Sequence, residues 1–133
     1  MVASGAGGAK RPRRPAVAVV PLLIHTTLFA YGAWTHSPTL NEPAHLVAGI
    51  SNWHLRRFDI YKVNAPLVRM AAASPVLATS PKTDWSRFFE GPAARLEAVL
   101  GEDFVRANGN RSLGLFVLAR WACIQGLRIK ILL

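Results

Sequence analysis

The chain has 133 residues, which is enough for one small domain. Apolar residues make up 51% of it, and this share excludes a disordered polar tail. The formal net charge of +9 lies mostly near the ends, because Lys10, Arg11, Arg13 and Arg14 precede the first apolar run and every acidic residue lies between 42 and 103.

The positive charge invites a nucleic-acid interpretation, but no zinc-ligand spacing and no aromatic-rich basic strand accompanies it. A basic cluster placed directly before an apolar segment follows the positive-inside rule of membrane proteins instead. The lone Cys123 permits no internal disulfide and does not fix the redox compartment. We therefore expect membrane lipid, and no nucleic acid, as a partner.

The N-terminal third predicts a tail followed by a membrane helix. Residues 1–15 are small, basic or proline, and we expect a disordered cytoplasmic tail. Residues 16–34 carry no formal charge and reach about 28 Å as a helix, close to the thickness of the hydrocarbon core. Tyr31 and Trp34 suit the aromatic belt at its far end. The pattern predicts a transmembrane helix in the plasma or inner membrane, with the N-terminus cytoplasmic.

A cleaved signal peptide is the alternative for this segment. Ala30-Tyr31-Gly32 resembles a cleavage site, and cleavage would leave a small secreted protein. The apolar run is longer than a usual signal core, which favours an uncleaved anchor. His25 inside the run is either a neutral histidine bonded within a helix bundle or an intramembrane proton or substrate contact.

Residues 35–111 predict an extracytoplasmic loop with amphipathic, interfacial helices. We expect a first helix over 39–57, capped by Thr39 or Asn41, with Pro43 in its first turn and the arginines at 56 and 57 at its end. Its apolar residues recur at helical spacing and form one face: Leu46, Gly49, Ile50 and Trp53.

The rest of this loop predicts three shorter helices and no convincing soluble core. A helix over 66–78, too short to span a membrane, is expected to kink or end at Pro75. A loop over 79–91 follows. A surface helix over 92–100 should stop at Gly101, and another should run over 102–107 to a break at 108–110.

Residues 112–133 predict the start of a second membrane helix that is incomplete, because Arg120 interrupts its apolar run. The expected fold class is therefore an all-α membrane protein with one N-terminal transmembrane helix, interfacial helices and an incomplete second transmembrane helix. The pattern does not predict an oligomeric state.

Glu42 and His45 are the candidate catalytic pair, because residues three apart on a helix share a face. A carboxylate and an imidazole can act as acid, base or metal ligands. No third ligand lies nearby in the sequence, so no metal site is predicted. The simpler interpretation, a first-turn helix charge and a packed surface histidine, remains open.

Four cations gather around the connector between the first two loop helices: Arg56, Arg57, Lys62 and Arg69. At a membrane surface such cations meet lipid phosphates. They either attract headgroups in general or bind the phosphate of a lipid carrier, and the sequence does not separate these roles.

The order of short motifs behind the first apolar helix adds a family likeness. N-E-P-A-H at 41–45, W-H-L-R-R-F-D at 53–59 and N-A-P-L-V-R-M at 64–70 resemble the N-terminal part of membrane glycosyltransferases of the GT-C fold. The likeness is to the protein-mannosyltransferase and aminoarabinose-transferase type (glycosyltransferase family 39) and the related RgtA/B/C/D-like domain. It covers about residues 16–125.

The resemblance implies sugar transfer from a polyprenyl-phosphate donor on the outer face of the membrane. Asn41-Glu42 stand in the place of the family's acidic pair, His45 in its histidine place and Ala65-Pro66-Leu67 in its P-P-L place. The cations at 56, 57, 62 and 69 would then bind the donor phosphate. No cofactor is specified, and a divalent cation is left open.

Two departures from the family pattern limit this expectation. Asn41 replaces the carboxylate that usually activates the acceptor, and an amide takes up no proton at neutral pH, so that role would fall to Glu42. The family also has many more membrane helices, so we expect a truncated fragment that is inactive alone. A non-enzymatic, membrane-anchored protein that binds anionic lipid or a protein partner is the alternative.

Overall fold

The computed structural model describes residues 15–88 and 96–132, and the side chains of 19–88 and 96–124. All regular secondary structure in these parts of the chain is helical, which confirms the all-α expectation. The helices are α1 (Pro15–Thr35), α2 (Glu42–His54), α3 (Pro66–Leu77), α4 (Leu96–Asn108) and α5 (Arg111–Leu132). The predicted tail lies outside the described residues, except that Pro15 begins α1.

Prolines and a helix-ending backbone conformation explain where the loop helices begin and end. Pro66 begins α3, where its missing N–H costs nothing, but Pro75 does not end that helix, which continues to Leu77. The predicted helix over 39–57 is shortened to α2. Arg56 adopts a left-handed φ of 52°, so the helix cannot continue through it, and the arginines at 56 and 57 lie beyond the helix end.

The prediction that Gly101 separates two helices is wrong, because α4 runs through it without a break. A Cβ at this position would lie 2.8 Å from the backbone nitrogen of Ala44 and 2.9 Å from the carbonyl carbon of Pro43. Gly101 therefore allows α4 to pack closely against the first turn of α2. The break predicted at 108–110 is confirmed, because α4 ends at Asn108, α5 begins at Arg111, and Gly109 between them has a φ of 53°.

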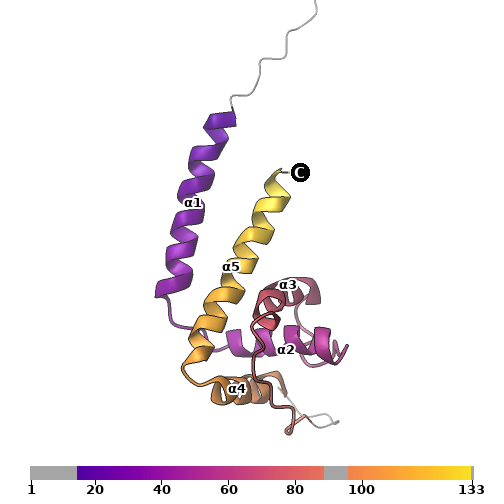
Figure 1. Ribbon diagram of the computed structural model, residues 1–133. Coiled ribbons are helices and arrows are strands. Elements are labelled where there is room, and N and C mark those ends of the chain that lie inside the picture. Colours follow the sequence, from indigo (N-terminus) through magenta and orange to yellow (C-terminus); the bar gives the residue numbers. More distant parts are fainter. Residues whose placement is uncertain (1–14, 89–95, 133) are drawn as a thin grey trace, which may run out of the picture.

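The expectation that the chain lacks a convincing core is also wrong. Helix α2 packs against both α3 and α4, and α3 packs against α5. The buried apolar residues of these four helices and of the connector form one cluster: Leu46, Val47, Ala48, Ile50, Ile60, Ala73, Val76, Leu100, Phe104, Leu115, Phe116 and Ala119. The helices α2 to α4 thus form a compact group, from which α1 and α5 project side by side (Figure 1).

Helix α1 exposes an extensive apolar surface. Eight of its large apolar side chains are between 47% and 72% exposed: Val19, Val20, Leu23, Ile24, Leu28, Phe29, Tyr31 and Trp34. The sequence expectation of a transmembrane helix rests on these same residues. Among the helices of the described part of the chain, none is both long enough and apolar enough to cross a bilayer.

Candidate functional site

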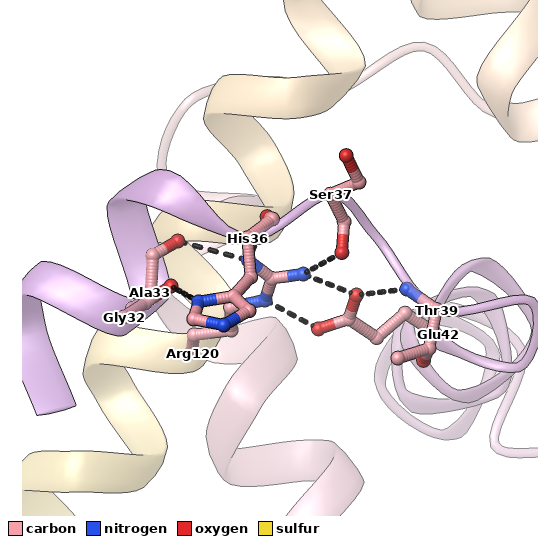
Figure 2. Close-up of polar contacts among 7 residues, drawn as sticks. All are labelled: Gly32, Ala33, His36, Ser37, Thr39, Glu42 and Arg120. Carbon is pink, nitrogen blue, oxygen red and sulfur yellow. Dashed lines mark hydrogen bonds and ion pairs between the residues drawn. The ribbon is translucent and has the colours of Figure 1, made fainter.

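Arg120, on α5, lies at the centre of a polar network that joins three helices (Figure 2). Its Nε and Nη2 donate to the two carboxylate oxygens of Glu42, at 2.5 and 2.6 Å. Its Nη1 donates to the backbone oxygens of Ala33 and His36, at 2.9 and 2.8 Å, and Nη2 also donates to Ser37 O at 3.2 Å. All five N–H donors of this guanidinium are therefore bonded.

The network caps the end of α1. The last carbonyls of a helix have no partner within the helix and carry the negative end of its dipole. Arg120 supplies both a donor and a positive charge to Ala33 in the last turn and to the two loop carbonyls that follow. The ring Nδ1 of His36 lies 2.9 Å from Gly32 O and covers another carbonyl of that turn. The network thus fixes α1 against α5.

Glu42, the first residue of α2, accepts a further hydrogen bond from the backbone N–H of Thr39 at 3.0 Å. Burial alone would raise the pKa of Glu42, but the hydrogen bonds and positive charge of Arg120 and the Thr39 amide lower it below its ordinary value. The carboxylate is therefore ionised and held from two sides. This is the geometry of a structural anchor, and a group held in this way accepts a proton poorly.

Glu42 also lines a cavity of about 440 Å³. Two of the three motifs that carry the family resemblance meet in it: Glu42 and His45 come from the motif at 41–45, and Asn64, Ala65, Val68 and Arg69 from the motif at 64–70. Apolar side chains form most of the remaining wall: Leu46, Ala72, Phe116 and Ala119. The cavity therefore combines a few polar groups with a largely apolar lining, as small-molecule sites do.

Arg69 is the most unusual group in this cavity, because it is a cation that is only 5% exposed. Nη1 donates to Tyr61 O at 2.6 Å and Nη2 to Asn64 O at 2.7 Å, while Nε is buried without a partner. Its guanidinium carbon lies 5.3 Å from the centre of the Tyr61 ring. No carboxylate of the described residues pairs with it.

Arg69 and Arg120 differ in whether their positive charge is paired. Both arginines line the cavity, but Arg120 is neutralised by Glu42 and fully bonded, whereas Arg69 keeps its positive charge and most of its donors. Buried charges are normally paired, because an isolated ion loses its hydration without compensation. The cavity therefore holds one uncompensated positive charge, and an anion would complete it.

His45 lines the same cavity. Its ring meets the Tyr61 ring edge-on, with the centroids 4.6 Å apart and the planes at 85°. Burial lowers the pKa of His45, and the charge of Arg69 lowers it further, against the opposing charges of Glu42 and Glu97. The imidazole is accordingly neutral at neutral pH and can either donate or accept a hydrogen bond.

The other four predicted site residues do not line the cavity. Asn41 is exposed at the N-cap of α2 and makes no side-chain capping bond. Arg57 is paired with Asp59, at 2.9 and 2.7 Å, and lies over the Phe88 ring. This pairing lowers the pKa of Asp59 to about 2. Arg56 and Lys62 are exposed.

Sequence reasoning missed Arg120 as a site residue and treated it only as an interruption of an apolar run. A partial signal was present, because a charged residue within an apolar helix requires a partner. The sequence does not identify Glu42, 78 positions away, as that partner. Tyr61, which contacts both His45 and Arg69, was also missed. No local pattern marks a connector tyrosine as part of a site.

The residues of the cavity do not fit a metal ion. Both oxygens of Glu42 are bonded to Arg120, which leaves the His45 ring and the Cys123 thiol as side-chain ligands among the described lining residues, too few for a metal site. Among the described residues, no three His, Cys, Asp or Glu side chains lie close enough together to hold a metal. The described lining therefore does not fit the divalent cation that the resemblance left open.

Comparisons with known proteins add no neighbour to this site. No family model, no curated protein and no solved structure matches the chain.

Proposed function

We propose that this chain is the N-terminal part of a membrane glycosyltransferase and that the cavity beside Arg69 binds the phosphate of a polyprenyl-phosphate-linked sugar. The observation that carries the proposal is the buried guanidinium of Arg69, which is 5% exposed and has no anionic partner among the described residues. A phosphate oxygen would accept from its Nη groups and offset its charge.

The lining of the cavity supports an amphiphilic ligand. The wall beside Arg69 is formed by apolar residues such as Val68, Ala72 and Phe116. A lipid-linked phosphate has a charged group directly attached to an isoprenoid chain, so the charge would meet Arg69 while the chain contacts the apolar wall. A small hydrophilic anion would contact Arg69 but would leave the apolar wall uncovered.

The exposed surface of α1 supports a membrane location. Soluble monomers rarely expose continuous apolar patches of this kind, and α1 exposes eight large apolar side chains. We assign this surface to contact with lipid, which would keep the cavity close to the membrane surface. A ligand anchored in the bilayer could then reach the cavity without leaving the membrane.

Within this proposal the chain binds and orients the donor and does not complete the transfer reaction. Glu42 is the only carboxylate among the described residues that line the cavity, and Arg120 holds both its oxygens. A general base must be free to take a proton at its working pH, and the lowered pKa of Glu42 opposes this. The catalytic role of Asn41, Glu42 and His45 stays a prediction.

The experiment is a calorimetric titration of the full chain, in lipid nanodiscs, with farnesyl methyl phosphate. This probe combines a short isoprenoid chain with a phosphodiester that carries one negative charge. We expect Arg69→Gln to weaken binding at least about tenfold, as expected for a charge-assisted contact worth about 1.5–3 kcal/mol. Arg106→Gln, which removes an exposed arginine on α4, should change the affinity less than about twofold.

A second variant separates loss of the site from loss of the fold. Ala72→Phe adds bulk to the cavity wall and leaves Arg69 in place, so it should also abolish binding. Circular dichroism identifies any variant that fails to fold. Binding of the probe by well-folded Arg69→Gln with unchanged affinity would overturn the proposal.

A different surface favours a second candidate function, direct binding to an anionic bilayer. The exposed cations Arg56 and Lys62 lie in the same connector region as Phe58, Val63 and Leu67, which are 51%, 83% and 76% exposed. Such surfaces bind anionic headgroups by charge and apolar contact. If this is the function, the double variant Arg56→Gln/Lys62→Gln will bind more weakly to vesicles that contain phosphatidylglycerol. Added salt will also weaken this binding. Arg69→Gln will leave it unchanged.

A further inference from the structure

His45 and Arg69 are coupled through one ring. The imidazole contacts Tyr61 edge-on at 4.6 Å between centroids, and the guanidinium of Arg69 lies 5.3 Å from the same centroid. Both side chains line the cavity of about 440 Å³. An anion beside Arg69 would therefore lie within the electrostatic reach of His45, in a largely apolar surrounding where charges interact strongly.

The charged groups that face His45 come from every helix packed around it. Glu42 precedes it by one turn on α2, Arg69 faces it from α3, Glu97 from α4, and Arg120 lines the same cavity from α5. Arg120 pairs with Glu42, and Glu97 does not line the cavity. Among the described residues that line the cavity, Arg69 is therefore the charged residue without an ionic partner.

We propose that His45 determines which charge state of the ligand this site accepts, an inference that rests on the proposed function. With His45 neutral, the site offers one positive charge and favours an anion with one negative charge. With His45 protonated, it offers two and gains affinity for any anion. A second negative charge brought into an apolar cavity without a partner is costly, which is why the neutral form discriminates.

The chemistry of the proposed reaction gives this selection a use. A polyprenyl-phosphate-linked sugar is a phosphodiester with one negative charge. Transfer of the sugar leaves a phosphomonoester, whose second ionisation has a pKa of about 6, so that it carries almost two charges at neutral pH. A site with one positive charge would retain the donor and release the spent carrier.

The direction of the pH effect follows from linkage. An anion bound beside His45 stabilises the protonated imidazole, so anion binding raises the pKa of His45, and protonation of His45 tightens anion binding by the same factor. Affinity for a permanently monoanionic ligand should therefore rise as the pH falls. Each unit by which the anion raises the pKa gives a tenfold gain.

The test uses the full chain in nanodiscs and dibutyl phosphate, which keeps one negative charge between about pH 8 and about pH 5.5. We expect its affinity to rise several-fold over this range. A coupling of about one pKa unit sets a limit of about tenfold, which is not reached at about pH 5.5 because burial and the charge of Arg69 lower the pKa of His45. His45→Gln should remove the pH dependence, so that its affinity for dibutyl phosphate stays constant over this range. The matched control is His54→Gln, which changes an exposed histidine of α2 outside the cavity and should keep the full pH dependence.

Charge selection is tested by a second probe at about pH 8. Monobutyl phosphate should bind at least about fivefold more weakly than dibutyl phosphate, because it carries a second charge. Affinity for dibutyl phosphate that depends on Arg69 but is flat with pH would overturn this inference and leave the proposed function standing. No binding of either probe at any pH would overturn both. An NMR titration that shows no rise in the pKa of His45 on addition of dibutyl phosphate would also contradict the inference.

Discussion

The guanidinium of Arg120 contacts both carboxylate oxygens of Glu42, at 2.5 and 2.6 Å, although 78 positions separate the two residues. The side chains are only 17% and 26% exposed. This pair joins the start of α2 to α5 and, through the carbonyls that Arg120 also binds, to the end of α1. The Arg120–Glu42 pair therefore fixes the position of α1 and α5 relative to α2, the helix that carries His45.

Loss of Arg120 should destabilise the fold. Arg120→Gln leaves Glu42 ionised without its partner and uncaps α1, and we expect a loss of about 2–3 kcal/mol, below the range for fully buried pairs because this pair is partly exposed. Arg106→Gln is the matched control, since its pair with Glu102 is exposed, and it should cost less than about 0.5 kcal/mol. Equal urea-unfolding free energies for the two variants would contradict this role.

Stability should fall in acid because of Glu42. A carboxyl group whose pKa is lowered in the folded state contributes stability that is fully present above its unfolded pKa, here about 4.5, and that is lost as the pH falls through the folded pKa. Glu42→Gln should therefore be less stable than the parent chain at neutral pH and lose less on acidification below 4.5. Urea unfolding at several pH values measures this, and parallel pH curves for the two chains would count against it.

The contact between α2 and α3 should tolerate no side chain at Gly49. A Cβ there would lie 2.3 Å from the carbonyl oxygen of Arg69, which is backbone and cannot move aside cheaply. We expect Gly49→Ala to cost about 1–3 kcal/mol and to weaken anion binding by displacing Arg69. Gly114→Ala is the control, because a Cβ at that helical position meets nothing within 4 Å and should stabilise the chain by about 0.5–1 kcal/mol. An unfolding free energy of Gly49→Ala equal to that of the parent chain, measured in urea, would contradict this prediction.

Helices with strong local signals could be predicted from the sequence, and those that depend on packing could not. The first apolar run predicted α1 closely, and Pro66 marked the start of α3. Gly101 predicted a helix end because glycine disfavours helices, but here it lies in the middle of α4, where the backbone of α2 approaches closely. That approach is a tertiary contact without a local pattern.

The candidate site was also predictable only where local signals mark its residues. Helical spacing brought Glu42 and His45 together, and Arg69 was one of four cations proposed for phosphate. The sequence gives no means to tell that Arg69 is buried and unpaired while Arg57 pairs with Asp59. The bond between Arg120 and Glu42 joins distant segments, so helical periodicity could not predict it.

The central claim is that the unpaired charge of Arg69 binds an anion, and the most direct test compares dibutyl phosphate with its neutral methyl ester, dibutyl methyl phosphate. The two esters have similar apolar surface, but only the first carries a charge. We predict that the parent chain binds the diester at least about tenfold more tightly than the neutral triester, as expected for a charge-assisted contact, and that Arg69→Gln removes this difference. Equal affinity of the parent chain for the two esters would contradict the claim.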